Sequence, residues 1–406
     1  MDMAKPIIRF KGYQDDWEQR KLGEVAPLRG GYAFKSSEYK KDGTPIVRIS
    51  NILPDGSIGA DFACYDDMEN DENISLRNGD ALLAMSGATT GKVSILKCKN
   101  TDKYYQNQRV GYFKRNIQYN YDFVSTIVRS DLFKEQLMSV LVAGAQPNVS
   151  SKEIDSFEFV FPLNIEEQKK IGQYFANLDT LITLHQRKCD ETKRLKKYML
   201  QKMFPQNGEK VPEIRFSGFT DDWEQRKFAD FTWNAGKRNK EDLDLEPYAI
   251  TNGHGFIRQR DAHDNFGYMK DTDRKAYNIV QPNSFAYNPA RINVGSIGYY
   301  KGVENVIVSS LYEVFQTDNH VNDRFLWHWF KSDEFPRWID KLQEGSVRLY
   351  FYYDKLCECQ LYMPSLEEQE KIASFLDGLD NLITLHQREL ENLQNIKKFM
   401  LGKMFA

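Results

Sequence analysis

The sequence predicts a mixed α/β (α+β) protein in which two variable domains are joined by two long antiparallel coiled-coil helices. Three observations predict it. Residues 8–24 and 214–230 are identical at 11 of 17 positions, and residues 166–204 and 367–405 at 21 of 39. Residues 25–161 and 231–363 lie between these blocks and show no extended identity. The repeated 39-residue blocks also carry a helical apolar pattern. The chain therefore has a pseudo-twofold internal repeat.

A chain of 406 residues is too long for one ordinary core, so more than one domain is expected. The repeated blocks divide it into five segments. We expect a first variable domain at 1–161, a first conserved helix at 162–205, a linker at 206–213, a second variable domain at 214–363 and a second conserved helix at 364–406. The linker is marked by PQNGEKVP (205–212), which combines Pro, Gly and polar residues.

Two weak similarities connect the variable domains. LAMSGATTGKVSIL (83–96) and FAYNPARINVGSIGYY (285–300) each place an apolar strand before a Gly-containing loop and a second strand. Residues 144–162 and 345–364 also share a faint pattern. We expect each domain to contain a twisted sheet with short helices.

The conserved helices begin at capping-box patterns, Asn164 with Glu167 and Ser365 with Glu368. Apolar residues then recur at steps of three and four over five heptads, which is typical of a coiled coil. Two adjacent rows are apolar, so the helices have more apolar surface than one helix pair needs, and further partners are expected. The helix interface is predicted at Ile171, Leu178, Leu181, His185, Leu195, Met199, Ile372, Leu379, Leu382, His386, Leu393 and Met400.

His185 and His386 are the clearly polar residues on the central stripe of both copies. Each lies at the midpoint of its block, and midpoints meet in an antiparallel pair. We predict that the two rings approach each other at the helix crossing. The alternative is that they face partner subunits or solvent.

Composition excludes several classes of protein. No apolar run approaches the length that spans a bilayer, and no secretory signal begins the chain, so a cytoplasmic protein is expected. Five scattered cysteines fit neither a disulfide framework nor a metal site. The net charge of −3 does not by itself support DNA binding. A DNA-binding chain of this charge needs local basic groups or a partner that supplies phosphate contacts.

No catalytic motif is complete. SGATTGK (86–92) has three residues between its glycines and Val93 after the Lys, so it does not match a phosphate-binding loop. Tyr287-Asn288-Pro289-Ala290 lacks the second Pro and the aromatic residue of an adenine methyltransferase site. The six histidines form no triad. We expect no catalysis by this chain.

The doubled DDWEQRK opening, the doubled EEQ-x-KI helix start and the doubled LITLHQR…KKxMLxKMF helix resemble the conserved regions of type I restriction-modification specificity subunits. The resemblance covers the whole chain. It implies that each variable domain is a target-recognition domain reading one half of a split site in double-stranded DNA. It also implies that the helices bind two methyltransferase subunits, which carry the restriction and motor subunits. S-adenosylmethionine, ATP and Mg²⁺ would belong to those partners and not to this chain.

Base reading requires side chains with paired donors and acceptors, chiefly Arg for guanine and Asn or Gln for adenine. Loop residues of these types, and of the first Gly-containing loop, are the candidates, although each also fits a solvated turn. They are Ser86, Thr89, Thr90, Lys92, Gln106, Asn107, Gln108, Arg109, Gln146, Asn148, Asn252, His254, Arg258, Arg260, Arg291, Asn293, Arg348, Tyr350 and Tyr352.

Two alternatives remain open from the residues. The chain could be a coiled-coil scaffold whose variable domains bind proteins, and salt-sensitive binding to one duplex would distinguish the two. It could also be an enzyme, which would require a catalytic constellation.

If the helices set the half-site spacing, a rod of roughly 58 Å limits the separation of the two half-sites to about 17 base pairs.

Overall fold

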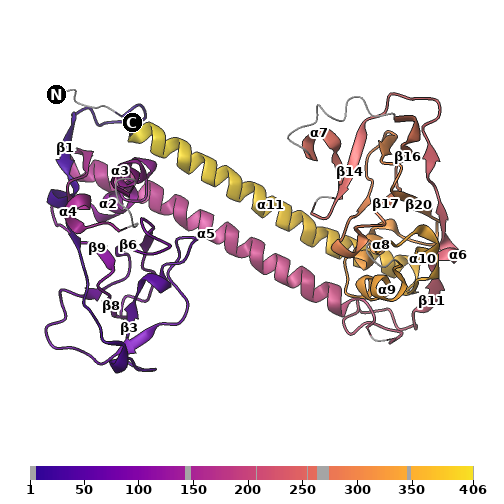
Figure 1. The fold of residues 1–406 in the computed structure, drawn as a ribbon, viewed down its shortest axis with the longest axis horizontal. Coiled ribbons are helices and arrows are strands. Elements are labelled where there is room, and N and C mark those ends of the chain that lie inside the picture. Colours follow the sequence, from indigo (N-terminus) through magenta and orange to yellow (C-terminus); the bar gives the residue numbers. More distant parts are fainter. Residues whose placement is uncertain are drawn as a thin grey trace. The chain divides into compact units, whose positions relative to one another are not determined.

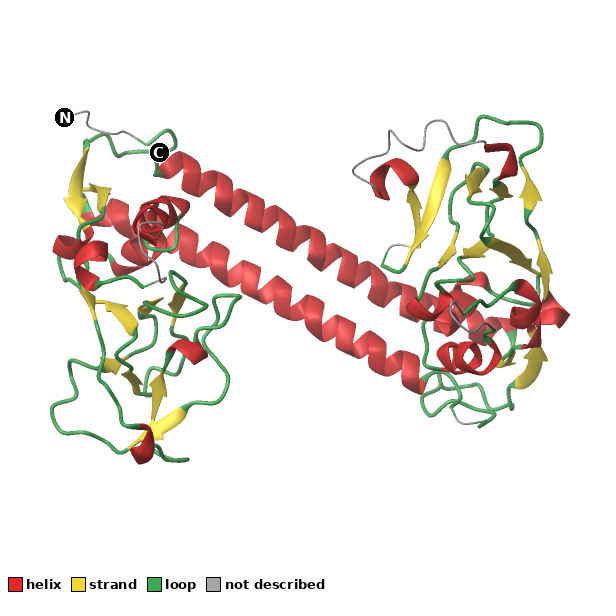
Figure 2. Ribbon diagram, in the orientation of Figure 1, coloured by secondary structure: helices red, strands yellow, loops and turns green. Residues whose placement is uncertain are grey.

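A computed structural model describes residues 6–141, 148–206, 208–253, 255–262, 274–344 and 349–405. The chain forms two compact units: unit 1 contains Met1–His185 with Arg388–Ala406, and unit 2 contains Gln186–Gln387. Both units combine short strands with helices (Figure 2), which confirms the predicted mixed α/β class. The two long helices are α5 (Ile165–Lys202) and α11 (Leu366–Met404), and each contributes to both units.

The described residues of unit 1 form two four-stranded sheets and one two-stranded sheet. The sheet orders are β2-β9-β6-β7, β4-β3-β8-β5 and β1-β10. The strands are β1 (Trp17–Lys21), β2 (Leu28–Arg29), β3 (Thr44–Val47), β4 (Ala63–Tyr65), β5 (Ser75–Leu76), β6 (Ala81–Ala84), β7 (Val93–Ile95), β8 (Tyr104–Gln106), β9 (Val110–Phe113) and β10 (Glu158–Pro162). The short helices are α1 (Leu22–Val25), α2 (Tyr121–Ile127), α3 (Asp131–Leu141) and α4 (Ser151–Asp155).

Unit 2 follows a similar plan. Its sheet orders are β12-β20-β17-β18, β13-β16-β19-β14-β15 and β11-β21. The strands are β11 (Glu224–Lys227), β12 (Thr232–Asn234), β13 (Lys237–Arg238), β14 (Pro247–Thr251), β15 (Gly255–Arg258), β16 (Asn278–Val280), β17 (Phe285–Tyr287), β18 (Ile297–Tyr299), β19 (Val306–Val308), β20 (Glu313–Thr317) and β21 (Gln360–Met363). The short helices are α6 (Phe228–Phe231), α7 (Gln259–Ala262), α8 (Asp323–Phe330), α9 (Glu334–Leu342) and α10 (Tyr353–Glu358).

The acidic residue of each predicted capping box pairs with an arginine. Glu167 is buried, and its carboxylate accepts two hydrogen bonds from the Arg9 guanidinium, at 2.6 and 2.8 Å. Glu368 accepts the same pair from Arg215, at 2.7 and 2.8 Å. Only the cap half of the prediction holds in each copy. Asn164 Oδ1 accepts the N–H of Glu166 at 2.9 Å, and Ser365 Oγ accepts the N–H of Glu368 at 3.4 Å. The two parallel arginine donors satisfy a carboxylate that burial would otherwise leave unpaired.

The C-terminal end of α11 lies in unit 1, near the beginning of α5 (Figure 1). Phe405 follows that end and is 5% exposed. Its ring centroid lies 5.4 Å from that of Phe123, 5.9 Å from Phe175 and 6.2 Å from Trp17. Unit 1 therefore buries residues from both ends of the chain in one core.

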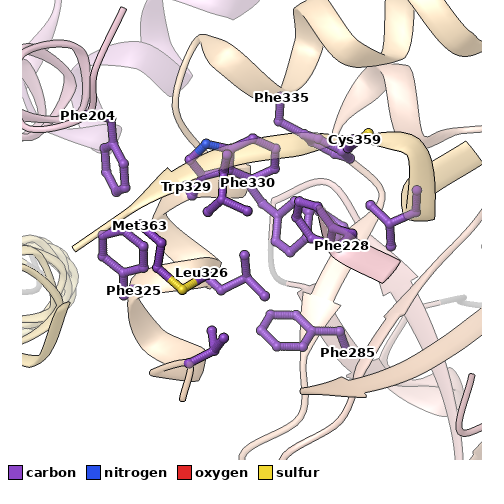
Figure 3. Close-up of a cluster of buried hydrophobic side chains, with 14 of the residues drawn as sticks. Phe204, Phe228, Phe285, Phe325, Leu326, Trp329, Phe330, Phe335, Cys359 and Met363 are labelled. Atoms are coloured by element: carbon purple, nitrogen blue, oxygen red, sulfur yellow. The ribbon is translucent and has the colours of Figure 1, made fainter. Parts of the chain in front are cut away.

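The end of α5 is buried in unit 2 in the same way. Phe204 is fully buried, and its ring centroid lies 5.3 Å from that of Phe325. The ring centroid of Trp223 lies 5.9 Å from that of Phe325. Figure 3 shows Phe204 and Phe325 at one edge of an aromatic core that continues through Trp329 and Phe330. Each unit thus starts one long helix and buries the end of the other.

One ion pair connects α5 and α11 within each unit. In unit 1, Lys397 of α11 donates a hydrogen bond to Asp179 of α5 at 2.5 Å. In unit 2, Lys196 of α5 donates to Asp380 of α11 at 2.5 Å. The two pairs are equivalent at the repeat offset of 201, as the predicted pseudo-twofold requires.

The predicted helix interface is partly wrong. Ile171, Leu178, Ile372 and Leu379 are buried, and His185, Met199, His386, Leu393 and Met400 are half-buried. Leu181, Leu195 and Leu382 are instead 42%, 42% and 46% exposed. From Leu178 onward the less exposed residues of α5 include Ile182, His185 and Cys189, at steps of four and three that also fit a heptad. The prediction added the row of Leu181 and Leu195 to that of Leu178 and His185, whereas the less exposed row is the one of Ile182 and Cys189 on the other flank. His185 and His386 belong to different units, and their meeting stays a prediction.

Asp377 of α11 holds a polar cluster against α8 in unit 2. It accepts hydrogen bonds from Arg324 Nε at 2.9 Å and from His328 Nε2 at 2.9 Å. Burial lowers the pKa of His328, and the hydrogen bond to Asp377 only partly offsets that effect. Burial acts against ionisation of Asp377, but its bonds to His328 and Arg324 hold its pKa well below the ordinary value.

Replacing the buried helix ends tests the shared cores. Phe405→Ala should destabilise unit 1 and Phe204→Ala unit 2, each by about 3–5 kcal/mol, because a buried phenyl ring leaves a cavity. Hydrogen exchange should show faster opening of β1 and β10 in the first variant, and of β11 and β21 in the second. If both variants opened the same strands, the assignment of each helix end to its unit would be wrong.

We predict that unit 2 loses stability in acid because His328 becomes protonated when it unfolds. The folded state keeps this ring neutral, whereas the unfolded state binds a proton below the ordinary pKa of 6.5. The free energy of unfolding should therefore fall as the pH drops below about 6.5, and less steeply in His328→Gln. Tryptophan fluorescence reports it, because five of the six Trp residues lie in unit 2. The control His320→Gln, at an exposed histidine, should retain the wild-type slope.

Candidate nucleic-acid interface

Both units contain a hairpin loop at equivalent places, as the sequence similarity predicts. Residues 85–92 connect β6 to β7, and residues 288–296 connect β17 to β18. A later segment is hydrogen-bonded to each loop: the N–H of Val149 donates to the Met85 carbonyl at 3.0 Å, and that of Phe351 to the Pro289 carbonyl at 3.1 Å. The faint similarity of 144–162 to 345–364 thus corresponds to a shared structural role.

In unit 1 this arrangement brings four predicted residues together. Ser86 forms an isolated antiparallel bridge with Asn148. The N–H of Met85 donates to the carbonyl of Arg109 at 3.0 Å, which places Arg109 beside the same loop. The side chains of Asn148, Arg109 and Gln108 are exposed. Together these residues form a polar surface that presents one guanidinium and two amides.

Gln106 does not belong to that surface. It is fully buried, and its side-chain amide donates to the carbonyls of Arg29 and Val110, both at 2.6 Å. The prediction of a base contact is wrong here, because the amide satisfies two backbone acceptors inside the domain. Asn107 is half-buried in the same turn, and Val110 N–H donates to its carbonyl at 2.9 Å.

The remaining predicted residues of the first loop shape the loop or face another groove. Thr90 Oγ1 donates to the Gly87 carbonyl at 2.6 Å, and the hydroxyl oxygen of Thr89 is buried. Lys92 lines a groove of about 420 Å³ together with Arg129 and Lys134 of unit 1. Its exposed ammonium is therefore a candidate for phosphate and not for a base edge.

A cavity of about 850 Å³ lies beside the second loop in unit 2. Four predicted residues line it: Arg291, Asn293, Tyr350 and Tyr352. The rings of Tyr350 and Tyr352 stack with centroids 5.5 Å apart and an interplanar angle of 4°. The structure thus gathers residues that lie about 60 positions apart in the sequence.

Two further residues of this cavity were missed by sequence reasoning. Arg238 lies in its wall, and its guanidinium donates to the carbonyls of Ala276 at 2.6 Å and Ser310 at 3.2 Å. Glu313 also lines the cavity, and burial raises the pKa of its carboxyl group. Both occur in short strands whose neighbours in space the sequence does not reveal.

The other candidates in unit 2 divide between two places. Asn252 lies against the second loop, since a Cβ built on Gly295 would approach its Oδ1 to 2.6 Å. Arg258 lines a separate cavity of about 560 Å³ with Glu246 and Glu304. Arg260 lies 3.7 Å from the Glu246 carboxylate. These acidic neighbours make Arg258 and Arg260 poor contacts for DNA. Gln146, His254 and Arg348 lie outside the described residues.

Other features bear on the predicted class. The five cysteines, all within the described ranges, are free thiols. None of the described helices is long and apolar enough to cross a membrane. His328, Asp377 and Asp380 come close enough to hold a cation, but Arg324 and Lys196 already pair with the carboxylates.

Comparison with known proteins identifies consistent relatives. The type I restriction modification DNA specificity domain matches residues 14–194 and again residues 220–395. The type I restriction enzyme MjaVIII specificity subunit of Methanocaldococcus jannaschii is 27% identical over 192 residues, which are 46% of this chain and 45% of that protein. In this match the chain spans about half the length of its relative.

Two further similarities extend over nearly the whole chain. A putative type I restriction enzyme MjaX specificity subunit of the same organism is 22% identical over 432 residues, 97% of this chain and 93% of that protein. The crystal structure of the type I restriction-modification system S subunit from M. genitalium has a TM-score of 0.66 at 12% identity and covers 99% of both chains. At this low identity the structural match shows a shared fold.

Proposed function

Because the chain belongs to the family of the type I restriction modification DNA specificity domain, we propose that its two variable domains each read one half of a split, asymmetric DNA target. The observation that carries the proposal is the hairpin loop that each unit contains at an equivalent place. The loops share their backbone setting and differ in the side chains beside them: Asn148 and Arg109 in unit 1, Arg291 and Asn293 in unit 2. Different base-edge donors in one setting would select different sequences.

The long helices are proposed to hold two methyltransferase subunits. Exposed apolar residues occur on them in equivalent pairs at the offset of 201. Unit 1 contains Leu181, Leu184, Ile396 and Phe399, and unit 2 contains Leu382, Leu385, Leu195 and Tyr198, each 42–56% exposed. We name these sets patch 1 and patch 2. A pseudo-twofold that repeats one apolar patch offers the same surface to two copies of one partner.

The partners would supply the chemistry. S-adenosylmethionine is proposed to bind the methyltransferase subunits, and ATP and Mg²⁺ the restriction and motor subunits attached through them. This chain would contribute recognition and scaffolding without catalysis. The net charge of −3 agrees with such a division, because partners that enclose the duplex can provide many of the phosphate contacts.

Exchange of one variable domain tests the split target. Replacing residues 231–363 with the corresponding domain of another family member should change one half of the methylated sequence and leave the other unchanged. The measurement is genome-wide mapping of methylated adenines in cells that produce the chain with its methyltransferase. A continuous motif or a perfect palindrome in the wild type would contradict the proposal. If the domains bound proteins instead of DNA, no sequence would be methylated selectively.

Charged substitutions in the patches test the scaffold. The double variant Leu382→Asp with Leu385→Asp should leave one methyltransferase subunit bound per chain. Adding Leu181→Asp with Leu184→Asp should leave none. The reason is that unpaired carboxylates are costly to bury in an apolar contact. Native mass spectrometry gives the stoichiometry. Ile117→Asp, at a residue that is 99% exposed and belongs to neither patch, is the control and should retain two copies. Two bound copies in the fourfold variant would rule out these patches.

A further inference from the structure

The cavity beside the second loop is lined by an arginine, Arg291, whose backbone position is fixed by hydrogen bonds. We propose that Arg291 reads a guanine in the half-site of the second domain, an inference that rests on the proposed function. Guanine presents two acceptors, N7 and O6, in the major groove, and the parallel donors of a guanidinium match them.

The backbone around Arg291 is held on both sides. Its N–H donates to the Asn288 carbonyl at 3.0 Å, and its carbonyl accepts from the N–H of Ser296 at 3.2 Å. The next residue, Ile292, is 3% exposed and anchors the loop in the core. Gly295 closes the turn at a φ of 84°, a conformation that favours glycine. The loop therefore presents its arginine from a defined position.

The guanidinium of Arg291 is available, unlike the others nearby. Every other arginine described within residues 214–363 makes an ion pair or a hydrogen bond inside the protein. The guanidinium of Arg291 makes neither an ion pair nor a hydrogen bond with the described residues. Burial raises the pKa of Tyr312 in the cavity wall, and the positive charge of Arg291 opposes that shift, which places the guanidinium near the cavity.

The surroundings of Arg291 favour a base edge over a phosphate. Asn293 presents an exposed amide beside it, and such side chains pair with base edges. The Asn288 amide instead accepts the backbone N–H of Ala290 at 3.0 Å and helps to hold the loop. The stacked rings of Tyr350 and Tyr352 form another part of the cavity lining. Arg238 also lies in the cavity wall, but its guanidinium is held by two backbone carbonyls. It therefore contributes a fixed positive charge and is less suited to reading a base.

Selection from a randomised duplex library tests the assignment, with the full-length chain assembled with its methyltransferase. The wild type should enrich guanine at a position in the half-site that the exchange of 231–363 assigns to the second domain. Arg291→Ala should reduce the preference at that position roughly 5- to 150-fold, the range of a good bidentate pair, and leave the other positions unchanged. Arg291→Lys should retain part of it, because an ammonium donates as a single point charge.

Arg258→Ala is the matched control, because Arg258 is an exposed arginine of the same unit beside acidic residues. It should enrich the wild-type sequence. A second half-site without guanine, or one unchanged in Arg291→Ala, would overturn the assignment while the proposed function stands. Weaker binding of Arg291→Ala to all duplexes alike would identify a phosphate contact and overturn it too. A wild type that enriches no sequence would contradict the proposed function itself.

Discussion

Each long helix begins in one unit and has its other end buried in the core of the second unit. The rest of the structure depends on this constraint. Phe405 completes the aromatic core of unit 1, and Phe204 that of unit 2. Both helices must therefore be continuous between the two cores. Buried pairs such as Arg9 with Glu167 then fix where each helix starts. A recognition surface in either unit is supported by a core that contains residues from both copies of the repeat.

The repeated blocks made the architecture predictable, because two copies of one sequence impose two copies of one set of contacts. The Trp of DDWEQRK, the Ile of EEQ-x-KI and the Met-Phe of KMF belong to one core in both units. Periodicity was less informative about which helix face is buried. Heptad spacing allows a row on either flank of the row of Leu178 and His185, one through Leu181 and Leu195 and one through Ile182 and Cys189. Both flanks contain apolar residues, and Leu181, Leu195 and Leu382 were misplaced for this reason.

The candidate site was predictable only in part, because residue type alone does not show what a side chain contacts. Gln106 and Arg109 lie three positions apart, yet one amide satisfies buried carbonyls and the guanidinium is exposed. Arg258 and Arg291 are chemically identical in the sequence, and only the fold shows that acidic residues surround the first. The hairpin loops were recognisable because a strand, a Gly-containing loop and another strand form a local pattern.

The division of the chain into units also imposes an order on biosynthesis. Unit 2 is one continuous stretch, Gln186–Gln387, whereas unit 1 needs Arg388–Ala406 in addition to its first 185 residues. On the ribosome unit 1 is thus begun before unit 2 and completed after it, and its core stays open until residues 388–406 emerge. Any truncated product lacking those residues would expose the apolar site of Phe405. Quality control could recognise an incomplete chain from that single defect, even when most of the sequence is present.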